Sequence, residues 1–193
     1  MEIEKGLYGL VLSGGESKRM GKDKSKLSYF GISQREWCYG LLGKFCEKVF
    51  ISVKTYEEDE TLPQVEDRFS FRSPLNGILS AMEASPGKAW LAVSCDMPFL
   101  NEEAVGFLLN QRDDSSLVTC FLDSDDKYPE PMVAVWEPEC LPLLRVFSKE
   151  SVRPRKFISE NSSNMVLAPE KRWLTNVNTD EEYRKVLSQL SQP

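Results

Sequence analysis

Short apolar runs alternate along this chain with longer segments of helical period, and this alternation limits the possible folds more than any other feature. The apolar runs predict strands at Leu7–Ser13, Lys48–Val53, Ala89–Ser94, Leu117–Phe121, Met132–Trp136 and Met165–Ala168. The segments between and after them predict helices at Gln34–Cys46, Leu75–Ala84, Glu102–Gln111, Glu139–Phe147, Arg155–Glu160 and Asp180–Gln189. Strands that alternate with helices are typical of an α/β protein with a largely parallel sheet.

Two of the predicted helices carry explicit start signals. Asn101 can accept a hydrogen bond from the first turn of its helix, where Glu102 and Glu103 also favour the positive end of the helix dipole. Thr179 with Glu182 three residues later forms a capping box. These positions therefore fix two helix boundaries.

Composition indicates one globular domain over residues 1–193. The 193 residues are 41% hydrophobic, and no linker rich in Pro, Gly or Ser divides them. With 24 basic and 30 acidic residues the net charge is −6, which argues against a nucleic-acid partner. The first residues are too polar for a signal peptide, and no apolar run approaches the roughly 18 residues of a membrane span. We therefore expect a cytoplasmic protein with no membrane partner.

The chain contains no histidine, which excludes whole classes of chemistry. A Ser-His-Asp or Cys-His catalytic device cannot be assembled, and neither can a zinc site that needs histidine. The five cysteines never form C-x-x-C, so we expect small buried hydrophobic side chains. The remaining reagents are carboxylates, lysines, arginines, amides or a hard metal ion.

The first apolar run leads into a glycine pair and then into cations. Gly14 and Gly15 lack Cβ atoms, so the backbone N–H groups can approach a ligand closely. Arg19 and Lys24 follow and supply positive charge suited to phosphate oxygens. This pattern predicts a cradle for a nucleoside triphosphate, with an ordinary β-to-α turn bearing a solvated basic face as the alternative.

Two common glycine motifs do not fit this loop. A Walker A loop needs four residues between its glycines and Ser or Thr after the lysine, whereas Gly15 and Gly21 enclose five and Asp23 follows Lys22. The dinucleotide fingerprint fails because Gly14 and Gly15 are adjacent. The loop is therefore neither of these standard types.

A second candidate site follows the predicted strand Ala89–Ser94. Asp96 stands just beyond its carboxyl end, where open α/β sheets bind ligands, and Pro98 turns the chain there. A carboxylate in this place suits Mg²⁺, which takes one or two carboxylates together with substrate phosphates. The alternative is an aspartate that only hydrogen-bonds the amides of the turn.

A third cluster and two charged loops complete the candidate features. Asn176 and Asn178 are two residues apart and share one face of an extended segment, where an amide can bind a phosphate or a metal-bound water. By itself, Asn178 is better explained as a helix-entry residue, and only the neighbouring motifs favour a ligand contact. We expect 123–127 to form a hairpin or surface loop, and 56–61 to be a similar solvated loop.

Five motifs occur in the order in which they occur in molybdenum cofactor guanylyltransferases, and from about Leu7 to Leu187 the chain resembles that family. The motifs are the loop L-S-G-G-E-S-K-R-M-G-K-D-K, Val65-Glu66-Asp67, Pro74-Leu75-Asn76-Gly77-Ile78, Cys95-Asp96-Met97-Pro98 and Asn176-Val177-Asn178-Thr179. The resemblance implies a three-layer, Rossmann-like, mostly parallel sheet of the nucleotide-diphospho-sugar transferase type, with helices on both faces.

The resemblance also implies an activity, its partners and its site residues. The reaction would be transfer of GMP from GTP to the phosphate of Mo-molybdopterin with release of pyrophosphate, and other proteins of molybdenum cofactor synthesis would be partners. The roles that follow are backbone contacts with the nucleotide from Leu12, Ser13 and Gly14, a phosphate contact from Lys24, a nucleoside contact from Asp67, Mg²⁺ at Asp96, and a ligand contact from Asn178. Arg19 is added as a phosphate clamp because of its charge and position.

The chain departs from the family pattern at several positions. Ser73 and Glu130 stand where members commonly have Gly and Gln, and Ser52 stands where an Asn often follows the second strand. The segment 151–156 also differs from the family pattern at its proline, although its cations still suit a phosphate-bearing acceptor. Two alternatives therefore stay open: a nucleotidyltransferase using CTP or UTP on another phosphorylated acceptor, and a non-catalytic nucleotide-binding protein. Trp90, Trp136 and Trp173 lie in or beside apolar runs and are expected in the core.

Overall fold

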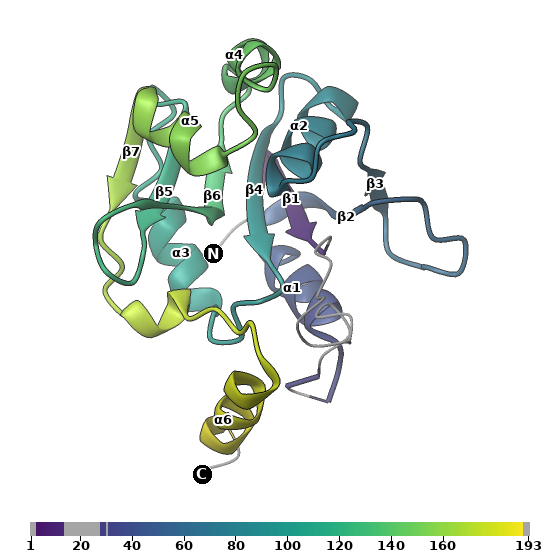
Figure 1. The fold of residues 1–193 in the computed structure, drawn as a ribbon, viewed down its shortest axis with the longest axis vertical. Coiled ribbons are helices and arrows are strands. Elements are labelled where there is room, and N and C mark those ends of the chain that lie inside the picture. The colour runs from purple at the N-terminus through teal and green to yellow at the C-terminus, as the bar shows by residue number, and fades with distance from the viewer. Residues whose placement is uncertain (1–2, 14–27, 30, 191–193) are drawn as a thin grey trace.

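The computed structural model describes residues 3–13, 28–29 and 31–190, and in this part of the chain a seven-stranded sheet carries helices on both faces (Figure 1). The strands are β1 (Glu4–Leu12), β2 (Cys46–Val53), β3 (Gln64–Glu66), β4 (Ala89–Ser94), β5 (Val118–Leu122), β6 (Pro129–Trp136) and β7 (Ser163–Val166). The helices are α1 (Gln34–Leu42), α2 (Pro74–Ala84), α3 (Glu102–Asn110), α4 (Cys140–Phe147), α5 (Pro154–Glu160) and α6 (Asp180–Leu190), with a 3₁₀ turn, η2, at Lys171–Leu174.

The strand order is β3-β2-β1-β4-β6-β5-β7, with β6 antiparallel to both of its neighbours and the other pairs parallel. The order reverses between β1 and β4, which pair in register from Leu7 with Ala89 to Leu12 with Ser94. Ligands of open α/β sheets bind outside the carboxyl ends of strands at such a reversal. The fold therefore places its binding crevice beside Leu12 and Ser94.

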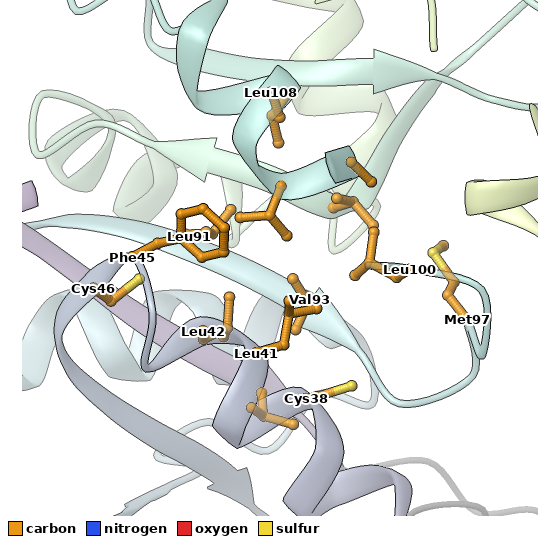
Figure 2. Packing of buried hydrophobic residues seen from close by; sticks show 14 of the residues in the cluster. Cys38, Leu41, Leu42, Phe45, Cys46, Leu91, Val93, Met97, Leu100 and Leu108 are labelled. Atoms are coloured by element: carbon orange, nitrogen blue, oxygen red, sulfur yellow. The ribbon is translucent and has the colours of Figure 1, made fainter. Parts of the chain in front are cut away.

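Both faces of the sheet are buried, which explains the continuous apolar runs of β1 and β4. One core packs α1 and α3 on the sheet, with side chains such as Leu42, Phe45, Leu91 and Leu108 (Figure 2). The other packs α2, α4 and α5 on the opposite face. In Figure 1, α6 lies at the bottom, apart from both layers, at the end to which the β4 arrow points. The expected three-layer arrangement is confirmed.

The structure corrects the bounds of the first helix and of the last strand, and it adds a strand that was not predicted. The first helix ends at Leu42 rather than Cys46, because Gly43 caps it through its N–H and Cys46 already begins β2. The last strand covers Ser163–Val166 rather than Met165–Ala168, because its pairing with β5 begins at Ser163. Strand β3 was not predicted, since its three residues are too few to show a period.

Other expectations are confirmed. Asn101 accepts a hydrogen bond from the N–H of Ala104 at 2.9 Å, and the Thr179 hydroxyl and Glu182 carboxylate form the reciprocal bonds of a capping box. All five cysteines are buried and free. Trp90, Trp136 and Trp173 are core residues. Among the described helices, none has the length and apolar character needed to cross a bilayer.

The two charged loops differ in the contacts that they make. Residues 123–127 turn the chain between β5 and β6, with Asp126 at φ 59°, as a hairpin requires. The prediction that 56–61 is a surface loop is confirmed, but two of its carboxylates do more than face solvent. Glu57 and Glu60 bind the guanidinium of the buried Arg35 at 3.0 and 2.9 Å, because a buried cation needs anionic partners.

Two arginines with similar geometry but different burial provide a test of what stabilises this fold. Arg112 binds Glu137 through two hydrogen bonds of 2.7 Å, and the Glu137 side chain is only 3% exposed. We expect Arg112→Ala to lower the free energy of unfolding by about 3 kcal/mol, because it strands a buried carboxylate. The measurement is urea unfolding at pH 7.

Arg145→Ala is the matched control. Arg145 also binds a carboxylate, Glu83, through two hydrogen bonds, but its side chain is 51% exposed. Solvent screens such a pair, so its removal has a much smaller effect. Equal losses in the two variants would show that burial does not set the strength of these contacts.

Candidate functional site

Asp96 lies directly beyond the carboxyl end of β4, and a distant segment is fixed to it. The backbone N–H of Val177 donates to the Asp96 carbonyl at 2.8 Å. Val177 itself is 1% exposed and points into the small cluster that it forms with Tyr29 and Val186. Asn176 and Asn178, on either side of Val177, both line the cleft that Asp96 lines, as the alternation of side chains along extended chain predicts. The predicted pairing of the two amides is thus confirmed.

These three polar residues line one cleft of about 680 Å³. Its walls come from the start of α2, the start of β6, and the connection from α4 to α5. The other residues of the lining are Arg72, Ser73, Pro74, Glu130, Pro131, Met132, Val152, Arg153, Pro154 and Arg155. Three guanidinium groups and two carboxylates therefore surround the same space.

The Asp96 carboxylate fits the expected cation. Its Oδ1 atom is buried and has no hydrogen-bond partner among the described residues. A buried carboxylate oxygen without a donor is costly, and a hard cation satisfies it. No group of three or more His, Cys, Asp or Glu side chains able to hold a metal occurs in the described part of the chain.

Glu130 is the second carboxylate of the cleft, and it is 3% exposed. Its Oε1 accepts from the Met132 N–H at 3.0 Å, and its Oε2 accepts from Arg155 at 3.2 Å. Burial raises the pKa of Glu130, Met132 and Arg155 oppose that rise, and the nearby Asp96 adds to it. Arg155 therefore offsets part of the cost of a buried negative charge.

A series of hydrogen bonds joins the carboxyl ends of β1, β2 and β3, on the other side of the reversal. The Ser13 hydroxyl donates to the Ser52 carbonyl at 2.6 Å, and the Ser52 hydroxyl donates to the Asp67 carboxylate at 3.2 Å. Burial raises the pKa of Asp67, while the bond from Ser52 opposes that rise. Ser52 is 4% exposed, so its hydroxyl contacts Asp67 rather than solvent.

Not all predicted site residues share the Asp96 cleft. Asp67 lines a different cavity, of about 540 Å³, together with Phe50, Arg68 and Trp90. Leu12 ends β1 and Ser13 follows it, at the strand reversal. Gly14, Gly15, Arg19 and Lys24 lie outside the described residues.

A family model with the description MobA-like NTP transferase domain matches residues 9–165, most of the chain. The chain belongs to this family. The match begins within β1 and ends within β7, so it includes the strand reversal, Asp67, Asp96 and Glu130. Asn176 and Asn178 lie beyond the matched residues.

Individual relatives agree with this assignment. A molybdenum cofactor biosynthesis bifunctional protein from Synechocystis is 32% identical over 93% of this chain, which spans 53% of that longer protein. A probable molybdenum cofactor guanylyltransferase from Mycobacterium avium is 28% identical, with 92% of this chain and 93% of that protein covered. The crystal structure of molybdopterin-guanine dinucleotide biosynthesis protein A from Archaeoglobus fulgidus has the same fold, with a TM-score of 0.79, 16% identity, and 95% and 98% of the two chains covered.

Arg72 and Glu130 were not predicted as site residues, whereas Arg155 belongs to the segment 151–156, whose cations were expected to suit a phosphate-bearing acceptor. Arg72, Arg155 and Glu130 enter the cleft from separate elements, and no local pattern links them. Tyr29 lies near Asp96, and burial raises its pKa, as do Tyr183 and Asp96. The departures at Ser73 and Glu130 were the available signal, since an unusual residue within a motif marks a place where contacts differ.

Gly77 provides a test of the Ser52 to Asp67 contact. A Cβ at position 77 would lie 2.3 Å from the Ser52 hydroxyl oxygen and 3.1 Å from Leu12. We expect Gly77→Ala to displace that hydroxyl from Asp67 and to lower the free energy of unfolding by about 1–3 kcal/mol. Urea unfolding measures the loss.

Gly40→Ala is the control, because a Cβ there meets no atom within 4 Å and Gly40 lies inside α1. Alanine is the better helix former, so we expect this variant to be as stable as the parent or more so. A Gly77→Ala protein that matches Gly40→Ala in stability would mean that α2 does not pack against Ser52 as described.

Proposed function

We propose that this protein transfers the guanylyl group of GTP to the phosphate of Mo-molybdopterin and releases pyrophosphate. We further propose that residues 1–193 act as one cytoplasmic nucleotidyltransferase domain that works with other proteins of molybdenum cofactor synthesis. The observation that carries the proposal is Asp96, which lines a cleft with two asparagines and three arginines at the strand reversal of a MobA-like domain. Its buried Oδ1 atom has no hydrogen-bond partner in the part of the chain that the structure describes. The names of the relatives support guanylyl as the transferred group.

The reaction needs alignment more than proton transfer. A phosphate monoester has a second pKa near ~6, so at neutral pH the acceptor is already a nucleophile. One of its oxygens attacks the α-phosphorus of GTP, and the bond from that phosphorus to the β-phosphate oxygen breaks. The electron pair of that bond leaves with pyrophosphate. No general base is required, in keeping with the absence of histidine.

Each group of the site has a role in this displacement. Leu12, Ser13, Gly14 and Gly15 would hold the nucleotide at the strand reversal, and Asp67 would contact the nucleoside. Lys24 and Arg19 would neutralise charge on the triphosphate. Asn178, beside Asn176 in the cleft, would donate to a phosphate or accept from bound water.

Asp96 is the residue of the site that would hold Mg²⁺. When bound, the ion supplies Lewis-acid stabilisation of the charge that develops on the phosphate oxygens. The protein contributes a positioned carboxylate, because the hydrogen bond from the Val177 N–H to the Asp96 carbonyl holds the Asp96 backbone beside the cleft.

Thermal unfolding with GTP, CTP, UTP or ATP at equal concentration, each with Mg²⁺, tests the nucleotide. A ligand at ~100 times its Kd adds about 2.7 kcal/mol, which is several degrees for a domain of this size. We expect GTP to give the largest increase in Tm. A larger increase with CTP or UTP would favour a nucleotidyltransferase acting on another acceptor.

Asp96→Asn tests the catalytic role. The amide keeps the size of the side chain but loses the negative charge, so we expect guanylyl transfer to fall by roughly 10²–10³ or more. Transfer is measured as pyrophosphate release with Mo-molybdopterin present. Asp114→Asn, at an exposed aspartate outside the cleft, is the control and should leave the rate unchanged.

Two results would contradict this assignment. Near-parental turnover by Asp96→Asn would remove Asp96 from the reaction. A parent protein that binds GTP but releases no pyrophosphate with the acceptor present would favour a non-catalytic nucleotide-binding protein.

A further inference from the structure

Two residues that line the cleft, Ser73 and Glu130, contact one and the same segment. Ser73 caps α2 by accepting from the Leu75 N–H, and its hydroxyl donates to the Val152 carbonyl. Glu130 binds Arg155, which lies three residues beyond Val152 along the chain. Ser73 and Glu130 therefore both bind the segment 152–155, which brings Arg153 and Arg155 to the cleft wall.

Arg155 is held but keeps donors to spare. One of its terminal nitrogens donates to Glu130 at 3.2 Å, and the other lies 3.8 Å from the Asp123 carboxylate. A guanidinium has five N–H groups, so most of them have no hydrogen-bond partner among the residues that the structure describes. The side chain is 48% exposed and lines the cleft, so these donors are accessible from it.

A buried carboxylate at position 130 requires a cationic partner such as Arg155. A buried carboxylate near Asp96 opposes the entry of an anionic substrate, and its burial alone is unfavourable. The contact with Arg155 offsets both effects. It also fixes the planar guanidinium, whose fork matches the oxygens of a phosphate.

We propose that Arg155 binds the phosphate of the acceptor and that Glu130 is the positioning residue that holds Arg155 in the cleft wall. This inference rests on the proposed function, since it assigns one group of the same cleft to the acceptor rather than to the nucleotide. It makes the acceptor a phosphate monoester bound on the side of Asp96 formed by 152–155.

The experiment is a titration of the protein with molybdopterin, under anaerobic conditions and without Mg²⁺, so that binding is measured in the absence of transfer. The variants are Glu130→Gln, Arg155→Ala and the double variant, which avoids a stranded buried carboxylate. Each is also titrated with GTP. Lys156→Ala is the matched control, because Lys156 follows Arg155 on α5 but pairs with Glu160 and does not line the cleft.

We expect the Kd for molybdopterin to be about tenfold or more higher in the double variant than in Glu130→Gln. The double variant also lacks Arg155, so it loses a charge-assisted hydrogen bond to the phosphate. Lys156→Ala should leave the Kd for molybdopterin unchanged, and the Kd for GTP should be unchanged in every variant. Glu130→Gln should weaken molybdopterin binding when Arg155 is present and not when it is absent. That coupling separates positioning from a simple charge effect.

Three results would overturn the inference. They are a parent that does not bind molybdopterin, an equal Kd for Glu130→Gln and the double variant, and an effect of Glu130→Gln that is the same in both backgrounds. A failure of guanylyl transfer alone would count against the proposed function and leave this titration interpretable, because binding is read without turnover.

Discussion

The parallel pairing of β1 with β4 is the constraint on which the rest of the site depends. It brings two strand ends, far apart in the sequence, to the same edge of the sheet, with Leu12 opposite Ser94. Where the connections that follow two adjacent parallel strands run to opposite sides of the sheet, a crevice opens between the strand ends. One side of that crevice carries Ser13, and the other carries Asp96. Every other contact described for the site is built outward from this pair of strand ends.

A single backbone hydrogen bond adds the third element of the site. Val177 donates to the Asp96 carbonyl, and the apolar Val177 side chain is buried on the far side of the segment. Burial of one side chain thus presents its two neighbours, Asn176 and Asn178, to the cleft. The same bond holds the Asp96 backbone beside the cleft.

The departures from the family pattern are connected to one another in space. Ser52 binds Asp67, Ser73 binds the Val152 carbonyl, and Glu130 binds Arg155. Each substituted side chain is satisfied by a partner that lies far away in the sequence. This is the behaviour expected when polar groups are buried, because an unpaired one costs more than the contact yields. The substitutions are therefore integrated into the site, and none leaves an unpaired charge.

The sequence by itself determined the α/β class, the strand that ends at Asp96, the helix caps at Asn101 and Thr179, and the common face of Asn176 and Asn178. These follow from period, capping chemistry and alternation, which act over a few residues. Only the tertiary structure decided that β3 forms, that Arg35 draws in Glu57 and Glu60, and that Glu130 meets Arg155 beside Asp96. Those contacts join residues 22 to 25 positions apart or depend on neighbouring strands. Local propensity carries no information about these contacts, because they depend on packing and on the pairing of buried charges in the folded chain.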